Sequence, residues 1–256
     1  MKDLELNEHD YYNDLANWSF DDIDMISETI TNWIYEDVIA EHATKDSKIL
    51  DLGTAAGEKV LKRFPECAEI LGTDYSEAMI ENANKNLKKY DKPYVHFKVM
   101  DNLHMDVPDD YFDIVTARHT VTAPDQIYKA LKKGGYLILR GVDKMDCWEL
   151  KRMFGRGQGF VDKKPISVAD YEAVLEAGFK EVELIPLHVV EYYKTPKDLY
   201  ALLVKVPILD DFSEFGGGYE KVPIEQDVFE KYVSENTTEK GIKLIRRYYG
   251  IIAKKL

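Results

Sequence analysis

The chain has 256 residues, 45% of them hydrophobic, and carries a formal net charge of −13 with a pI of about 5.0. This length fits one domain with an elaboration, and the hydrophobic content excludes a generally disordered chain. An acidic surface repels phosphate backbones, so nucleic acid is disfavoured as the main partner.

Cysteine usage and apolar runs narrow the class of protein further. The two cysteines, Cys67 and Cys147, lie far apart and form no C-x-x-C pair, so neither a disulfide framework nor a structural metal site is expected. The first ten residues are charged, and no apolar run approaches 18 residues. We therefore expect a cytoplasmic protein without a signal peptide or a membrane-spanning segment.

The predicted elements begin with a helical N-terminal cap over residues 1–45. Apolar residues recur at three- and four-residue spacing, which is typical of a helix, and Asp21 or Asp22 is placed to cap it. The spacing rests on Ile23, Ile26, Ile30, Trp33 and Ile34.

From Ser47 onward, short apolar runs alternate with amphipathic segments. The runs predict strands at 48–52, 69–74, 95–100, 112–117, 136–141, 181–193 and 242–253. The other segments predict helices at 57–64, 76–90, 124–132, 146–153, 167–177, 196–205 and 224–235. Such alternation predicts βαβ units and a mostly parallel α/β sheet. We expect one α/β domain from residues 46–193 plus 242–256, with 194–241 as an insertion that covers the active site.

The segment from Asp51 to Gly57 is the most informative part of the sequence. It follows an apolar strand, carries glycines at 53 and 57, and leads into an amphipathic helix. A strand, a glycine loop and a helix N-terminus in this order bring backbone N–H groups against a polar ligand. Asp74 ends the second strand 21 residues after Gly53, where a carboxylate suits the two hydroxyls of a ribose.

The glycine pattern separates two nucleotide-binding families. A dinucleotide fingerprint that starts at Gly53 needs glycines at positions 55 and 58, where this chain has Ala55 and Glu58. The pattern acid-x-Gly-x-Ala-x-Gly instead resembles the first motif of class I S-adenosylmethionine-dependent methyltransferases, which usually has glycine in place of Ala55. Segments that resemble four further motifs of this family follow in order, at 71–79, 99–102, 111–115 and 131–138. The resemblance covers about residues 47–141 and points to the small-molecule, ubiquinone-biosynthesis-like group of the family.

This resemblance implies a fold and a set of cofactor-binding residues. The fold is Rossmann-like and doubly wound, with seven strands of which the last is antiparallel. The family pattern places Asp74 on the ribose and Asp101 on the adenine amino group, with Tyr75 and Met79 as candidate walls for the adenine. The implied S-adenosylmethionine-binding residues are Asp51, Gly53, Thr54, Ala55, Gly57, Asp74, Tyr75, Met79, Asp101, Asn102 and Ala117.

Residues that act on the methyl acceptor are less marked in the sequence. Methyl transfer from a sulfonium is an in-line displacement that positioning alone can accelerate, and a base is optional for an amine or anion acceptor. Arg118 and His119 follow the fourth strand, where ligands of open α/β sheets bind, and they are the candidate catalytic residues. A salt-bridged arginine and a structural histidine are the alternatives.

Two further segments are candidates for binding the acceptor. Arg156 and Gln158 stand between glycines at 155, 157 and 159, which allow close backbone approach, and a plain flexible loop is the alternative. Tyr11 and Trp18 belong to an aromatic N-terminal segment that would form a lid favourable to a sulfonium cation, or else pack as part of a helix.

The sequence therefore predicts an S-adenosylmethionine-dependent methyltransferase (EC 2.1.1.-) with a small-molecule acceptor, acting as a monomer or homodimer. One alternative is an RNA methyltransferase, because residues 201–207 faintly resemble a segment of ribosomal-RNA guanine methyltransferases, although the cysteines of their zinc module are absent. The second alternative is a cofactor-binding protein without transfer activity, since a fold does not fix a function.

Overall fold

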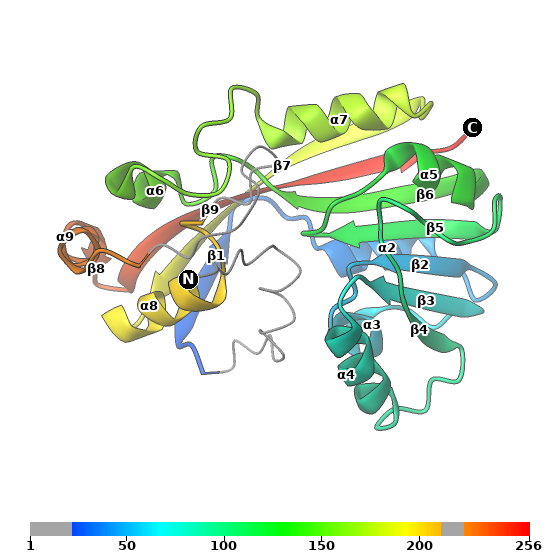
Figure 1. Ribbon diagram of the computed structural model, residues 1–256, viewed down its shortest axis with the longest axis horizontal. Coiled ribbons are helices and arrows are strands. Elements are labelled where there is room, and N and C mark those ends of the chain that lie inside the picture. Colours follow the sequence, from blue (N-terminus) through cyan, green and yellow to red (C-terminus); the bar gives the residue numbers. More distant parts are fainter. Residues whose placement is uncertain (1–21, 211–222) are drawn as a thin grey trace, which may run out of the picture. The chain divides into compact units, whose positions relative to one another are not determined.

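The computed structural model describes residues 22–210 and 223–256, which form an α/β fold (Figure 1). Its strands are β1 Met25–Thr29, β2 Lys48–Leu52, β3 Glu69–Asp74, β4 Val95–Val99, β5 Phe112–Arg118, β6 Leu131–Val142, β7 Glu181–Tyr193, β8 Thr237–Thr238 and β9 Gly241–Lys254. Its helices are α2 Tyr35–His42, α3 Glu58–Arg63, α4 Glu77–Leu87, α5 Pro124–Ala130, α6 Trp148–Phe154, α7 Ile166–Glu176, α8 Pro196–Lys205 and α9 Gln226–Asn236. The hydrogen-bonded strand order is β1-β7-β9-β6-β5-β2-β3-β4, and β8 pairs with β9.

The described residues divide into two compact units. The glycine-loop unit comprises Trp33–Gly141, Ser167–Ile185 and Tyr249–Leu256. The second unit comprises the described parts of Met1–Asn32, Val142–Ile166 and Pro186–Tyr248. The domain division expected from the sequence follows other boundaries and stays a prediction.

The glycine-loop unit is built on parallel strands. β2 pairs in parallel with β3 and β5, β3 with β4, and β5 with β6. Helices α3 and α4 lie on one side of these strands and α5 and α7 on the other (Figure 1), which is the doubly wound arrangement. Buried Ile49, Ile114 and Ile138 pack with Tyr35 and Ile39 of α2 in one core. Because the strands are parallel, their carboxyl ends meet at one edge, where ligands of such sheets bind.

The second unit has its own apolar core. Leu199 and Leu202 of α8 pack with Phe229 and Tyr232 of α9. At its edge, β1 pairs antiparallel with the second half of β7. This unit therefore contains the packed helices α8 and α9 and the antiparallel strands β1 and β7.

Buried charges connect the strands of the second unit to the start of α6. Arg246 of β9 donates to both carboxylate oxygens of Asp146, with Nε–Oδ1 and Nη2–Oδ2 distances of 3.0 Å, and to Glu191 Oε2 at 3.2 Å. The Tyr193 hydroxyl donates to the same Glu191 oxygen at 2.5 Å, and all four side chains are buried. A full set of hydrogen bonds of this kind is what offsets the desolvation of buried ions.

The helix expected across residues 23–34 is wrong. Met25–Thr29 form β1, and α2 begins only at Tyr35. Ile26 and Ile30 meet the helical spacing, but their side chains are 56% and 71% exposed, so they form no buried helical face. Backbone pairing with β7 outweighs the local period, as tertiary context often does. Residues 1–21 of the expected cap lie outside the described residues.

The Rossmann-like fold and all seven expected strands are confirmed, and the described residues add β1 and β8. These two strands lack the apolar run that marked the others: β1 is exposed along its whole length, and β8 has two residues. β6 begins at Leu131 rather than 136, because this residue already pairs with Phe112 of β5 across a register shift. Residues 133–135, which lie between the predicted helix 124–132 and the predicted strand 136–141, are therefore part of β6.

Candidate active site

The loop between β2 and α3 adopts left-handed backbone conformation at three positions. The φ angles are +70° at Gly53, +48° at Ala55 and +77° at Gly57. Glycine reaches this region without steric cost, whereas a residue with a Cβ pays about 1–2 kcal/mol. The chain therefore keeps the glycine turn of the motif and holds strain at Ala55.

A side chain at either glycine of this loop would collide with the protein itself. A Cβ on Gly53 would lie 2.7 Å from the Cβ of Thr120, which follows β5. A Cβ on Gly57 would lie 2.6 Å from Cζ of Phe97 in β4. Both distances are shorter than real Cβ contacts, so the loop is closely packed against its neighbours.

Asp74, at the end of β3, holds the loop in place. Its Oδ2 accepts a hydrogen bond from the backbone N–H of Ala55 at 2.9 Å, and its Oδ1 accepts from the N–H of Ser76 at 3.0 Å. Ser76 in turn caps α4, because its Oγ accepts from the N–H of Met79 at 3.3 Å. The residue expected to bind a ribose therefore also connects the glycine loop to the next helix.

Asp51 is a buried carboxyl group at the base of the loop. Its side chain is 6% exposed, and Oδ1 accepts a hydrogen bond of 2.7 Å from the Thr116 hydroxyl of β5. Burial raises the pKa of Asp51 to about 6, although the Thr116 hydrogen bond and the Arg118 charge act in the opposite direction. The ionised form is thus disfavoured here and would gain from a nearby ligand cation.

Four buried polar atoms of the glycine-loop unit make no hydrogen bond of good geometry within residues 22–210 and 223–256. They are the Trp33 Nε1, the Tyr35 hydroxyl, the Thr54 Oγ1 and the Asn102 Oδ1. A buried polar group without a partner is costly and is normally satisfied by protein, water or ligand. Thr54 and Asn102 were expected from the sequence to contact the cofactor, and Trp33 and Tyr35 were not.

Asp101 and Asn102 follow β4 and shape the next turn. The Asp101 carboxylate accepts from the N–H of Leu103 at 2.9 Å and contacts His104 Nδ1 at 2.8 Å. The His104 hydrogen bond is the main cause that lowers the pKa of Asp101. Asn102 Nδ2 donates to Thr120 Oγ1 at 3.0 Å and so ties this turn to the segment after β5.

The three apolar candidates for the cofactor site differ in exposure. Tyr75 is 56% exposed, whereas Met79 and Ala117 are almost fully buried. Met79 lies in the first turn of α4 and packs in the interior. Tyr75 is therefore exposed enough to contact a bound adenine. Met79 packs in the hydrophobic core.

Arg118 and His119 lie at the carboxyl end of β5, as the sequence suggested. Burial raises the pKa of Asp51 and the Arg118 charge acts against this, whereas the pKa of Glu36 is lowered mainly by Lys59, with Arg118 contributing in the same direction. The Nε2 atom of His119 contacts Nη1 of Arg140. A guanidinium only donates, so Nε2 accepts and the neutral ring carries its proton on Nδ1. This contact occupies the lone pair that a general base would use.

The sequence profile described as a methyltransferase domain matches residues 43–185, more than half of the chain. The chain belongs to this methyltransferase family. Its match includes the glycine loop, Asp74, Asp101 and the segment after β5.

Individual relatives of this methyltransferase-family chain are distant. The uncharacterized methyltransferase YcgJ of Bacillus subtilis (strain 168) is 30% identical over 94 residues, which cover 37% of this chain and 35% of YcgJ. The arsenite methyltransferase of Halobacterium salinarum is 29% identical over 158 residues, covering 54% of this chain and 38% of that enzyme. The chain therefore spans less than two fifths of the length of either relative.

A solved structure supports the fold over most of the chain. The crystal structure of a Bacillus halodurans protein described as a candidate methyltransferase has a TM-score of 0.56 to this chain. The match covers 86% of this chain and 98% of that one at 17% identity. At this identity the likeness concerns the fold alone.

Of the residues expected to bind the acceptor, Arg156 has partners within the second unit. Its Nη1 donates to the carbonyl of Leu209 at 2.7 Å, and its Nη2 donates to the carbonyl of Pro223 at 2.9 Å and to Glu225 Oε2 at 3.0 Å. This guanidinium therefore joins two chain segments, which is an internal role. Tyr11 and Trp18 lie outside the described residues.

The glycines around Gln158 enclose a buried lysine. Lys151 Nζ donates to the carbonyl of Gln158 at 2.8 Å and to that of Lys144 at 2.6 Å. A Cβ on Gly157 would lie 2.6 Å from the Lys151 side chain. Contacts with the buried Lys151 side chain therefore hold the segment 155–159 in place. The sequence pattern alone did not predict these contacts.

Sequence reasoning missed Tyr35, Thr116 and Arg140. Thr116 had a detectable signal, because the predicted strands 48–52 and 112–117 place it opposite Asp51 once they pair. Tyr35 had none, since its place beside the sheet depends on where α2 begins. Arg140 depends on the β5–β6 register in the same way.

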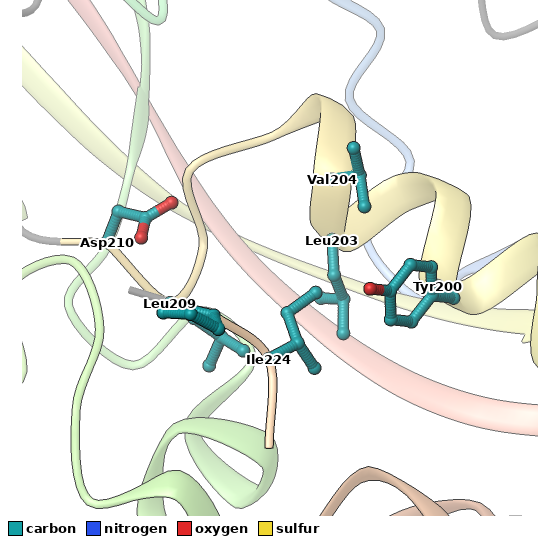
Figure 2. Close-up of a pocket in the computed structure, with 7 residues that line it drawn as sticks. Tyr200, Leu203, Val204, Leu209, Asp210 and Ile224 are labelled. Carbon is teal, nitrogen blue, oxygen red and sulfur yellow. The ribbon is translucent and has the colours of Figure 1, made fainter. Parts of the chain in front are cut away.

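The second unit contains a small cavity of about 160 Å³ (Figure 2). Tyr200, Leu203 and Val204 of α8 point into it, together with Leu209, Asp210 and Ile224. Pockets for drug-sized ligands measure about 300–1,000 Å³, so this cavity is too small to be a substrate site by size alone.

Within residues 22–210 and 223–256, no helix is long and apolar enough to cross a membrane, and no group of three or more His, Cys, Asp or Glu side chains is placed to hold a metal ion.

Proposed function

We propose that this chain is an S-adenosylmethionine-dependent methyltransferase that transfers a methyl group to a small-molecule acceptor. One observation carries the proposal: the buried carboxyl group of Asp51 lies at the base of a glycine loop that Asp74 holds in place. Burial raises the pKa of Asp51, so a bound cation would stabilise its ionised form. Membership of the methyltransferase family supports the same reading. When bound, S-adenosylmethionine supplies a methyl group activated by a sulfonium.

The residues present fit this cofactor. Asp51 would hold the ammonium of its amino-acid part, because an adjacent cation favours the ionised carboxylate. Asp74 would accept from the ribose hydroxyls, since a carboxylate accepts several hydrogen bonds. The Thr54 Oγ1 near the Asp51 carboxyl and the Asn102 Oδ1, which has no partner among the described residues, offer two more polar contacts in the same unit.

The acceptor side of the site works mainly by positioning. Holding two reactants in line can contribute about 7–11 kcal/mol to a displacement. His119 contacts Arg140 through Nε2, and an acceptor that is already nucleophilic would need no base from it. The net charge of −13 supports a small molecule over RNA as the acceptor.

Isothermal titration calorimetry with S-adenosylmethionine and S-adenosylhomocysteine tests the cofactor. We expect Asp74→Ala to weaken both affinities about 100-fold, because the hydrogen bonds of this carboxylate to Ala55 in the loop and to Ser76, and its contacts to the ribose, are lost. Asp109→Ala, which removes one exposed carboxylate of the same unit, is the matched control. Equal affinity in the Asp74 variant, or no binding by the wild type, would refute the cofactor assignment.

The acceptor class is tested by the release of S-adenosylhomocysteine. We expect turnover with members of a small-molecule panel of amines, thiols and acids, and none with bulk transfer or ribosomal RNA. Salt-sensitive turnover with RNA alone would favour the RNA alternative. Cofactor binding without turnover on any acceptor would favour a binding protein without transfer activity.

A further inference from the structure

Tyr35 is the first residue of α2, and its hydroxyl group is buried in the core of the glycine-loop unit. The residue is 4% exposed, and the hydroxyl makes no hydrogen bond of good geometry within residues 22–210 and 223–256. Burying a hydroxyl is costly unless a nearby polar group can satisfy it. The groups beside the Tyr35 hydroxyl therefore indicate what it does.

The strand register shows which groups these are. The Tyr35 ring packs in one core with Ile49 of β2 and Ile114 of β5. These two isoleucines are register partners, and so are Asp51 and Thr116, two residues further along the same strands. Side chains two residues apart in a strand project to the same face. The Tyr35 ring and the Asp51–Thr116 pair therefore lie on one face of the sheet.

The Thr116 hydroxyl lies between the other two groups. Its Oγ1 donates to Asp51 Oδ1 at 2.7 Å. Burial raises the pKa of Tyr35 and the Asp51 charge acts in the same direction, whereas the Thr116 hydroxyl acts in the opposite one, so both groups are neighbours of a phenol that keeps its hydrogen. A hydroxyl has one hydrogen and two lone pairs, so Thr116 can accept from Tyr35 while it donates to Asp51.

The charged groups around Asp51 come from several elements. Arg118 of β5 favours the ionised form of Asp51, and Asp74 of β3 disfavours it. Glu36 of α2, an acid that also lies near Arg118, is paired with Lys59 of α3 at 3.2 Å. A substitution that removes only a hydroxyl leaves these charges in place, so a change in the titration of Asp51 would report that hydroxyl.

We propose that Tyr35 is a positioning residue of the cofactor site: its hydroxyl donates to Thr116 Oγ1 and, through it, helps to hold the Asp51 carboxylate ionised for the ammonium of the cofactor. Hydrogen bonds in such a chain polarise one another, so the outer bond strengthens the inner one. The inference rests on the proposed methyltransferase function. It adds to the site a residue that lies outside the matched segment 43–185.

The first test follows the Asp51 carboxyl carbon by NMR in the whole chain without cofactor. We expect Tyr35→Phe to raise the midpoint of the Asp51 titration by about 0.5–1 pH unit, because the ionised form loses a hydrogen bond of ordinary strength while the ring stays in the core. Tyr94→Phe removes a hydroxyl beside Glu66 and Cys67 at another point of the same core, and it should leave the midpoint unchanged.

The second test measures the affinity for S-adenosylhomocysteine by calorimetry at two pH values. Tyr35→Phe should weaken this affinity about three- to ten-fold at pH 5 and less than about two-fold at pH 8, because Asp51 is ionised at pH 8 in both proteins. Loss of packing alone would weaken the affinity by the same factor at both pH values.

Thr116→Val removes the middle hydroxyl and tests the route. In this background, Tyr35→Phe should add no further shift to the Asp51 midpoint. Three results would overturn the inference: an unchanged midpoint in Tyr35→Phe, the same shift with and without the Thr116 hydroxyl, or an equal loss of affinity at pH 5 and pH 8. A wild type that binds no S-adenosylhomocysteine refutes the proposed function instead, and the first test is independent of that result.

Discussion

Replacing Asp51 by asparagine should make the ligand-free protein more stable. Raising the pKa of this carboxyl from 3.8 to about 6 means that the ionised form destabilises the fold by about 3 kcal/mol above pH 6, at about 1.4 kcal/mol per pH unit. The cost shrinks as pH falls, to less than about 1 kcal/mol near pH 4, because the folded form is then already protonated. Asparagine has no charge and still offers an oxygen to the Thr116 hydroxyl.

Urea unfolding without cofactor measures this effect. We expect Asp51→Asn to raise the free energy of unfolding by about 2–3 kcal/mol at pH 8 and by much less at pH 4. Asp109→Asn removes the same charge from an exposed position and should change it by no more than about 0.5 kcal/mol at either pH. An Asp51 variant that is no more stable than the wild type at pH 8 would refute the reasoning.

Three further predictions concern the cofactor, the loop and the buried ions. The affinity for S-adenosylhomocysteine should fall about ten-fold per pH unit well below pH 6 in the wild type, because protonation removes the Asp51 charge, and calorimetry on Asp51→Asn should show no such dependence. Gly53→Ala should abolish S-adenosylhomocysteine binding in calorimetry, because the added Cβ would lie 2.7 Å from the Cβ of Thr120. Gly134→Ala, which has an equally left-handed φ of +84° but nothing within 4 Å, should cost only about 1 kcal/mol of stability, and equal effects of the two would argue against the packing account. Arg246→Met should lower the free energy of unfolding by about 3–5 kcal/mol in urea, since it leaves two carboxylates buried without their cation, and a neutral result would mean that this cluster is not held as described.

The glycine loop and the strands around it could be predicted because their signals are local. The motif from Asp51 to Gly57 fixes a turn through its own residues, and the acid at Asp74 follows at the spacing that the next strand dictates. The same holds for Ser76, whose side chain caps α4 by accepting from the N–H of Met79 three residues on. Each of these depends on neighbours within a few residues.

The rest of the site depends on register and on packing between distant segments. No local pattern marks Arg140, which meets His119 only because β5 and β6 pair in one register. Arg156 is a candidate ligand contact by its glycine neighbours, and its partners within the protein, from residues 209–210 and 223–225, could not be read from that local pattern. β1 was mistaken for part of a helix because its apolar residues follow helical spacing, and only its pairing with β7 makes it a strand.

The Arg156 side chain also has a consequence for α8 and α9, two helices of the second unit. By donating to the carbonyls of Leu209 and Pro223 and to the Glu225 carboxylate, one guanidinium holds the residues after α8 against those before α9. Loss of this one side chain should therefore loosen the end of one helix and the start of the other together.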